Sequence, residues 1–160
     1  MPGRANFIRR YGGIYEDSPW VAEAVWPAAG ALRSAPAMST AMAAVVDSAP
    51  REQKLALIRA HPQLASRARM ADASVREQSG AGLDQCSPRE FADFQRLNAA
   101  YNDRFGFPFI VAVKGLSRRD ILDAFEARLA NAPEAEFAEA LRQIHRIAGF
   151  RLAELFEDAT

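Results

Sequence analysis

The chain has 160 residues, enough for one domain with a sizeable core, and its equal numbers of basic and acidic residues give a formal net charge of zero. This balance argues against nucleic acid or an anionic membrane as a partner, because both attract a broad positive surface. No apolar run approaches the roughly 18 residues of a membrane span, and the single cysteine, Cys86, excludes an internal disulfide, so we expect a cytoplasmic protein.

The composition of the chain predicts an all-α fold, because alanine is abundant, runs of β-branched residues are scarce and prolines stand where segments begin. We expect a single domain over residues 1–160, a multi-helix bundle with one short extended connector near residues 109–113. Before residue 61, helices are predicted over residues 5–11, from Ser18-Pro19 to about Ala29, from Ser39 to Val46, and from Pro50 to Ala60. Residues 30–37 are predicted to form a loop.

His61-Pro62 interrupts the helical pattern, because proline disfavours helical geometry in the residue before it and favours the first turn of a following helix. A helix is therefore predicted from Pro62 to about Met70. Ser74 and Glu77 have the Ser-x-x-Glu spacing of a capping box, which predicts the start of a short helix that ends at the glycines that follow.

The second half of the chain has clear helix starts and one run that resembles a strand. Ser87 to Glu90 form a capping box, and apolar residues at helical spacing then continue to a stop at residues 106–108. Residues 109–113 have no partner strand, so we expect a buried connector whose N–H and C=O groups need partners from elsewhere, such as a ligand. Further helices are predicted from residue 117 to Leu129 and from Pro133 to Glu157.

His61 is the first candidate for chemistry. It can be a junction histidine whose ring nitrogens bond to backbone groups, or a general acid or base, because a pKa near 6.5 suits proton transfer at cellular pH. A metal site is disfavoured, because the sequence has no close His/His or Cys/His spacing.

Ser74, Glu77 and Gln78 form the second group. The capping box alone explains the first two of these residues. A functional interpretation needs Glu77 to face a cavity and orient the ring of His61, while Gln78 can bond an amide or ureido group through its paired donor and acceptor.

Arg151 is the third candidate, because it lies on the apolar stripe of the last predicted helix. An arginine in this place usually extends its guanidinium to water. The alternative is a buried guanidinium that grips a carboxylate with two parallel hydrogen bonds. His145 lies at the edge of the same stripe and is expected to be structural, and Cys86 has no role that the sequence suggests.

The motifs appear in a fixed order along the chain, and together they resemble the 2-oxo-4-hydroxy-4-carboxy-5-ureidoimidazoline (OHCU) decarboxylase family of urate degradation. Each motif alone is weak, but the ordered set is specific and extends from Gly12 to about Leu155. The motifs are Gly12-Gly13-Ile14-Tyr15-Glu16-x-Ser18-Pro19-Trp20-Val21, His61-Pro62-Gln63-Leu64, Ser74-x-x-Glu77-Gln78-x-x-Ala81-Gly82-Leu83-Asp84, Leu97-Asn98-x-x-Tyr101, and Arg104-Phe105-Gly106-Phe107-Pro108-Phe109-Ile110.

The resemblance implies an all-α homodimer that converts OHCU to (S)-allantoin without a cofactor. It also suggests functional coupling to hydroxyisourate hydrolase and urate oxidase, because the substrate is unstable. The catalytic residues that it implies are His61, as the acid, and Glu77. The substrate-binding residues that it implies are Pro62, Ser74, Val75, Arg76, Glu77, Gln78, Phe109, Ile110, Val111, Ala112, Val113 and Arg151.

The chemistry gives this set a consistent mechanism. The electron pair left by departing carbon dioxide delocalises within the substrate, so the enzyme must orient the carboxylate, stabilise the developing oxyanion and deliver one proton. Our hypothesis is that His61 delivers it, that Glu77 orients the imidazole and favours its charged form, and that Arg151 and the backbone of residues 109–113 hold the ring. The alternative is a helical interaction module without catalysis, or a degenerate family member that binds a purine derivative.

Overall fold

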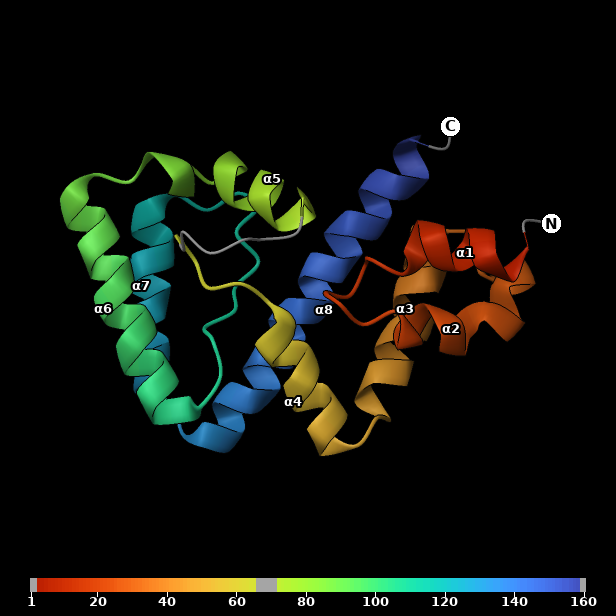
Figure 1. The fold of residues 1–160 in the computed structure, drawn as a ribbon, viewed down its shortest axis with the longest axis horizontal. Coiled ribbons are helices and arrows are strands. Elements are labelled where there is room, and N and C mark those ends of the chain that lie inside the picture. Colours follow the sequence, from red (N-terminus) through yellow and green to blue (C-terminus); the bar gives the residue numbers. More distant parts are fainter. Residues whose placement is uncertain (1–2, 66–71, 159–160) are drawn as a thin grey trace. The chain divides into compact units, whose positions relative to one another are not determined.

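The computed structural model describes residues 3–65 and 72–158, and in this part of the chain the regular elements are all helices (Figure 1). The predicted all-α fold is confirmed. The helices group into two compact units, Met1–Ala60 with Ile144–Thr160 and His61–Gln143, and the long last helix contributes to both. The single domain over residues 1–160 stays a prediction.

The first unit contains the N-terminal helices and the second part of the last one. Its core is formed by apolar side chains of α2, α3 and α8, including Val21, Met38, Met42, Val46 and Leu152. Its elements are α1 (Arg4–Tyr11), α2 (Trp20–Val25), the 3₁₀ helix η1 (Trp26–Ala31), α3 (Ala35–Asp47), α4 (Arg51–Ala60) and the end of α8 (Pro133–Asp158).

Two helix predictions in this unit were wrong. The helix expected from Ser18 to Ala29 divides into α2 and η1, because Pro27 lacks the N–H that a continuing α-helix needs. The loop expected over residues 30–37 ends early, because Ser34 rather than Ser39 caps α3 and accepts a hydrogen bond from the Ala37 N–H at 3.2 Å.

His145 links buried Tyr15 to exposed Asp47 through its two ring nitrogens, which gives it a structural role. Its Nδ1 shares a hydrogen bond of 2.7 Å with the Tyr15 hydroxyl, and its Nε2 lies 2.9 Å from the Asp47 carboxylate. Burial, and to a smaller extent the charge of Asp47, raises the pKa of Tyr15. The phenol is therefore neutral at ordinary pH.

The second unit is built around the neighbouring helices α6 and α7 (Figure 1). Both begin with a capping box, at Ser87 and at Ser117, and α6 ends at Gly106, whose φ of 77° is left-handed. An aromatic cluster around Tyr101, with Phe109 and Phe125, fills the space between them. The elements are α5 (Asp72–Gly80), the 3₁₀ helix η2 (Leu83–Gln85), α6 (Pro88–Phe105), α7 (Arg118–Leu129) and the start of α8.

The predictions between Pro62 and Glu77 need correction. Residues 62–65 form no helix, and the remainder of the helix expected to reach Met70 lies outside the described residues. α5 begins at Asp72, so Ser74 and Glu77 lie inside the helix and do not cap it. The capping-box interpretation of this pair was wrong, because an earlier residue already starts the helix.

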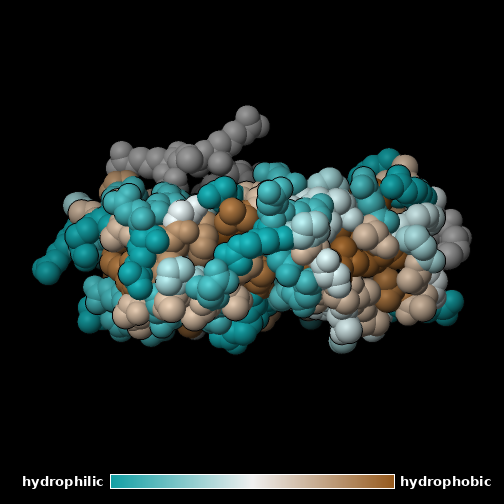
Figure 2. Space-filling model, turned by 90° about the horizontal axis from the view of Figure 1, so that it is seen from below, coloured by the Kyte–Doolittle hydropathy of each residue, from teal (hydrophilic) through white to brown (hydrophobic). Residues whose placement is uncertain are grey.

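Large apolar side chains are rarely exposed on the described surface. On the face in Figure 2, hydrophilic side chains separate the apolar areas from one another. Among the described residues, Val75 is the only exposed large apolar side chain, at 43% exposure. In this part of the chain, no helix has both the length and the apolar character required to span a membrane.

Candidate active site

The segment that carries His61 is buried and held in an unusual conformation. His61 follows the end of α4 directly and is 7% exposed. Ala65, four residues on, has a φ of 54°, and such a left-handed conformation costs a non-glycine residue roughly 1–2 kcal/mol. Its N–H donates to Gln78 Oε1 at 3.1 Å, and its carbonyl accepts from Gln95 Nε2 at 3.2 Å. Two glutamine side chains therefore fix the strained end of the segment.

The α5 residues divide between two faces. Ser74 and Gln78, four residues apart, are buried, whereas the side chains of Val75 and Arg76 are exposed. Gln78 uses its carboxamide on the segment described above, since it also donates to the Gln63 carbonyl at 3.4 Å. The predicted contact of Gln78 with a ureido group stays a prediction.

One face of α6 links the His61 segment to the apolar connector. Asn98 donates to the Leu64 carbonyl at 3.0 Å, and Tyr101 donates to the Glu136 carboxylate at 2.6 Å. Gln95, Asn98 and Tyr101 follow one another at intervals of three residues, which places them along one helix face. The buried Oδ1 of Asn98 has no hydrogen-bond partner within the described residues.

Residues 109–113 form the buried connector that the sequence predicted. None of them is more than 9% exposed, and none belongs to a helix or strand. The Ile110 carbonyl accepts from Arg128 Nη1, the Ala112 N–H donates to Gln143 Oε1 at 2.9 Å, and the Val113 carbonyl accepts from the Leu116 N–H at 3.0 Å.

In the described part of the chain, Val111 pairs neither its N–H nor its C=O with another protein group, and the same holds for Phe109. Buried backbone groups are nearly always paired with protein or water. The connector therefore carries a buried donor and a buried acceptor that no protein group uses in the described ranges.

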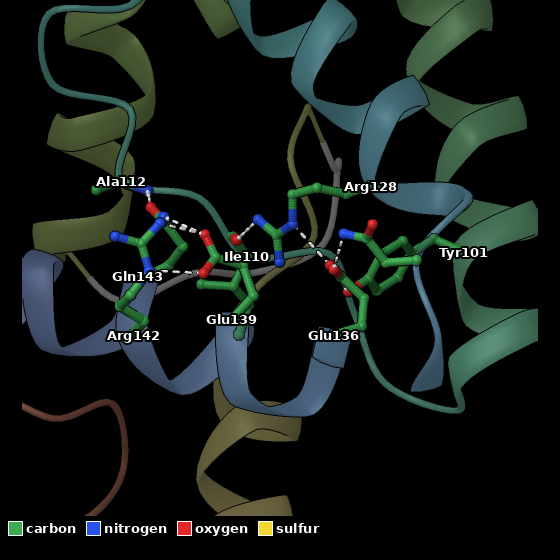
Figure 3. A network of polar contacts seen from close by, with 9 residues as sticks. Tyr101, Ile110, Ala112, Arg128, Glu136, Glu139, Arg142 and Gln143 are labelled. Atoms are coloured by element: carbon green, nitrogen blue, oxygen red, sulfur yellow. Dashed lines mark hydrogen bonds and ion pairs between the residues drawn. The ribbon is translucent and has the colours of Figure 1, made fainter. Parts of the chain in front are cut away.

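The sequence analysis missed the residues that hold the connector, and Figure 3 shows them around it. Arg128 reaches it from α7, and Glu136 and Gln143 reach it from α8. One signal was present in the sequence: Arg128 lies seven residues after Ile121, on the buried stripe of α7. Nothing in the sequence pattern showed which carboxylate would pair with it.

Arg151 belongs to the first unit, where it is buried. The side chains of Arg151 and Glu16 are 7% and 5% exposed, and Arg151 Nη1 lies 3.0 Å from Glu16 Oε1. The same nitrogen donates to the carbonyls of Ile14 at 3.2 Å and Gly13 at 3.4 Å. Of the two interpretations of Arg151, the buried guanidinium is confirmed and the guanidinium exposed to water is wrong. A contact between Arg151 and substrate stays a prediction.

Two further kinds of candidate site among the described residues are a cluster of metal-ligating side chains and the single cysteine. In these ranges, no three His, Cys, Asp or Glu side chains group to hold a metal ion. Cys86 Sγ donates to the Leu83 carbonyl at 3.4 Å, and burial followed by the charge of Glu90 raises the pKa of its thiol. A raised pKa makes this thiol a poor nucleophile near neutral pH.

Comparison with known proteins identifies the family. Residues 2–153 match the family model described as OHCU decarboxylase. The chain belongs to the OHCU decarboxylase family. A relative of that name from Haloferax volcanii is 44% identical over 151 residues, which cover 94% of this chain and 89% of the relative. The uric acid degradation bifunctional protein PucL of Bacillus subtilis is 45% identical over 92% of this chain and 30% of its own length.

Two solved structures resemble this OHCU decarboxylase family member. The crystal structure of (S)-allantoin synthase has a TM-score of 0.79 and 34% identity, and covers 96% of this chain and 51% of that one. A crystal structure of OHCU decarboxylase in the presence of (S)-allantoin has a TM-score of 0.67 and 25% identity, and covers 78% and 83%. The family resemblance seen in the sequence is thereby confirmed.

Proposed function

We propose that this chain is a carboxy-lyase of urate degradation that converts OHCU to (S)-allantoin without a cofactor. The relatives support this activity, because those similar over most of their length carry the name OHCU decarboxylase. The connector supports it most directly. A buried segment with an unpaired donor and acceptor on Val111 suits a small polar ring with amide-like edges.

The bonds that change in this reaction lie within the substrate, so the protein need not form a covalent bond to it. When the bond between C4 and the carboxylate breaks, its electron pair forms a double bond between C4 and C5 of the ring, and the pair of the former double bond between C5 and the ring nitrogen moves to that nitrogen, which takes up a proton. C5, which bears the ureido group, then takes up a proton, and the C4 hydroxyl becomes the ring carbonyl. The protein must orient the carboxylate, stabilise the transient charge and protonate one face of C5.

We assign the proton to His61. Its segment is buried and rigidly held at Ala65, and an imidazole is the side chain best suited to give a proton near neutral pH. Glu77 would orient the ring and favour its charged form. The connector backbone would hold the substrate ring, together with Pro62, residues 74–78 and Arg151.

We also propose a homodimer that acts in the cytoplasm beside the enzymes that make its unstable substrate. Support for such coupling comes from PucL, which is described as a bifunctional protein of uric acid degradation. Size-exclusion chromatography with light scattering would test the dimer, and a mass near 17.6 kDa, that of one chain, would contradict it.

The activity can be tested with OHCU generated in place. Urate, urate oxidase and hydroxyisourate hydrolase would supply the substrate, and circular dichroism would follow optically active allantoin. We expect fast, stereospecific product formation by the wild-type chain. His61→Asn should reduce turnover by at least about 10²–10⁴-fold, the usual contribution of general acid catalysis.

The matched control is His145→Asn, the same substitution at the other histidine of the chain. Because the His145 ring bonds to Tyr15 and Asp47 in the first unit, its variant should keep wild-type turnover per folded molecule. Near wild-type turnover in His61→Asn would remove His61 from the mechanism. Racemic product at the rate seen without protein would support the non-catalytic binding module instead.

A further inference from the structure

We infer that a buried clamp, made of the Arg128–Glu136 ion pair and of Gln143, positions the connector at residues 109–113 for substrate binding. This inference deepens the proposed function and rests on it. The clamp residues would act as positioning residues, because none of them is assigned to the reacting atoms. Arg128 and Gln143 bond the connector directly, and Glu136 holds Arg128.

The ion pair at the centre of the clamp is buried and closely bonded. Glu136 is fully buried and the Arg128 side chain is 10% exposed, with 2.6 Å between Nε and Oε1. Tyr101 donates to the same oxygen at 2.6 Å (Figure 3), and Asn131 donates to the other at 3.0 Å. Every carboxylate oxygen thus has a partner, which a buried charge requires.

The guanidinium is also fixed by its contact with the connector. Its carbon lies 4.5 Å from the centre of the Phe109 ring, and that ring stacks on Phe125 at 3.9 Å with an angle of 11°. From this place Arg128 Nη1 donates to the Ile110 carbonyl. The clamp therefore binds both the side chain at the start of the connector and the backbone one residue later.

Gln143 holds the connector two residues further on. Its Oε1 accepts from the Ala112 N–H at 2.9 Å, and its Nε2 donates to Glu139 at 3.1 Å, which fixes the orientation of the carboxamide. Arg142 in turn holds Glu139 at 2.6 Å, so Gln143 stands at the end of an ordered row on α8 (Figure 3).

These two bonds determine which way the next backbone groups point. In an extended segment, the polar groups of alternate residues face the same side and those of the residue between them face the other. The Ile110 carbonyl and the Ala112 N–H face the clamp, and from this alternation we infer that the N–H and C=O of Val111 point away from it. Phe109 and Val111 are the connector residues for which neither backbone group has a protein partner among the described residues.

Stability alone is a poor explanation of this arrangement. Apolar side chains of similar volume often stabilise a fold as much as a buried ion pair does, or more, because both charges of the pair lose their hydration. Arg128 Nη2 also remains without a hydrogen-bond partner in the described part of the chain, which carries a cost of its own. What the pair provides is a fixed position for one backbone carbonyl.

The test uses two variants that weaken the clamp in different ways. The double variant Arg128→Met/Glu136→Gln removes both charges together, so that no unpaired charge remains buried. Gln143→Met keeps the ion pair and removes the acceptor of the Ala112 N–H. The control is Arg119→Met on the same helix, since Arg119 is 82% exposed and pairs with exposed Asp123.

Three quantities would be measured for each variant: the free energy of unfolding in urea, KM and kcat with OHCU generated in place, and the ¹⁵N-amide shift of Val111 during titration with (S)-allantoin. We expect both clamp variants to fold, to raise KM about tenfold, the equivalent of one misplaced hydrogen bond, and to lose most of the Val111 response. Arg119→Met should match the wild type in all three.

A purely structural role predicts a different result: lower stability, but an unchanged KM and Val111 response in the molecules that fold. That result in Gln143→Met would overturn the inference, even if the double variant did not fold. A wild-type chain that neither turns over OHCU nor binds (S)-allantoin would overturn the proposed function, and with it the clamp as a device for substrate binding.

Discussion

Two buried arginines, one in each unit, hold irregular segments in the same way. Arg128 pairs with Glu136 and bonds the Ile110 carbonyl, and Arg151 pairs with Glu16 and bonds the carbonyls of Ile14 and its neighbour. Each pair is almost completely removed from water. By side-chain chemistry alone, the two arginines would be assigned the same role.

The segments that they hold differ in their own hydrogen bonding. In the segment held by Arg151, Ile14 N–H donates to the Tyr11 carbonyl, and Ser18 bonds back through both its N–H and its hydroxyl. The connector leaves both polar groups of Val111 without a protein partner in the described ranges. The two segments therefore differ in their backbone hydrogen bonding and not in the arginine that holds them, and ligand binding by the connector stays a proposal.

The largest expected effect is a loss of stability when either buried arginine is replaced. Equal losses would confirm that the two ion pairs stabilise the fold alike. Arg128→Met and Arg151→Met each leave a buried carboxylate without its counter-charge, so each should lower the free energy of unfolding by about 3–5 kcal/mol. Urea denaturation measures this loss. Arg119→Met should stay within about 0.5 kcal/mol of the wild type. A loss below about 1 kcal/mol in either variant would mean that its carboxylate reaches water.

The next experiment would separate the two arginines by function. Arg151→Lys keeps a positive charge for Glu16 but replaces a planar fork by a point charge. If Arg151 also contacts the substrate, KM should rise roughly tenfold, the equivalent of one lost hydrogen bond, with kcat little changed. An unchanged KM and rate would assign Arg151 to the turn at Gly13 to Glu16 only.

A buried tyrosine in each unit makes a smaller, pH-dependent contribution to stability. Burial, followed by the hydrogen bond to Glu136, raises the pKa of Tyr101, and burial raises that of Tyr15. Their stabilising effect is present below the unfolded pKa of about 10 and is lost as pH rises toward the folded value.

Stability should therefore fall above about pH 10. Tyr101→Phe and Tyr15→Phe should each cost about 1 kcal/mol at neutral pH, for one lost hydrogen bond. The difference between wild type and variant should shrink in alkaline urea titrations. A difference that stays constant from pH 8 to 11, a range of about three units, would show that the phenol ionises equally in both states.

The smallest expected loss of stability comes from substitutions at the helix caps, and these should leave the site unchanged. Ser117→Ala in the second unit and Ser34→Ala in the first should each cost roughly 0.5–1 kcal/mol without changing KM. Hydrogen bonds from Ser117 lower the pKa of Asp120, so its stabilising effect is present above the unfolded pKa and lost as pH falls through the folded value. Thermal melts near pH 3 and pH 7 would measure this. A rise in KM would show that a cap positions the connector.

Parts of the fold with local signals were predictable from the sequence. The capping boxes at Ser87 and Ser117 and the stop at Gly106 were correct, because they depend on residues within one helical turn. The start of α5 was wrong, since Ser74 and Glu77 have the spacing of a cap but lie inside a helix that begins at Asp72. Spacing alone does not show which of several polar residues begins a helix.

The candidate site was predictable to a smaller extent. The buried connector and its need for outside partners followed from an apolar run without a second strand, and the structure agrees. The clamp did not follow, because Arg128, Glu136 and Gln143 come from two helices separated by a turn. Their pairing depends on the packing of α7 and α8 around the connector, which no local pattern encodes.

The sequence by itself determined the all-α fold, most helix boundaries and, through its ordered motifs, the OHCU decarboxylase family. Helix periodicity, capping and proline geometry act within a few residues, so they can be read directly from the chain. The tertiary structure alone decided which buried charges pair, that Arg151 holds Glu16, and that Val111 keeps an unpaired N–H and C=O within the described residues. Such pairings depend on distances between residues far apart in the chain, and only the packed fold fixes those distances.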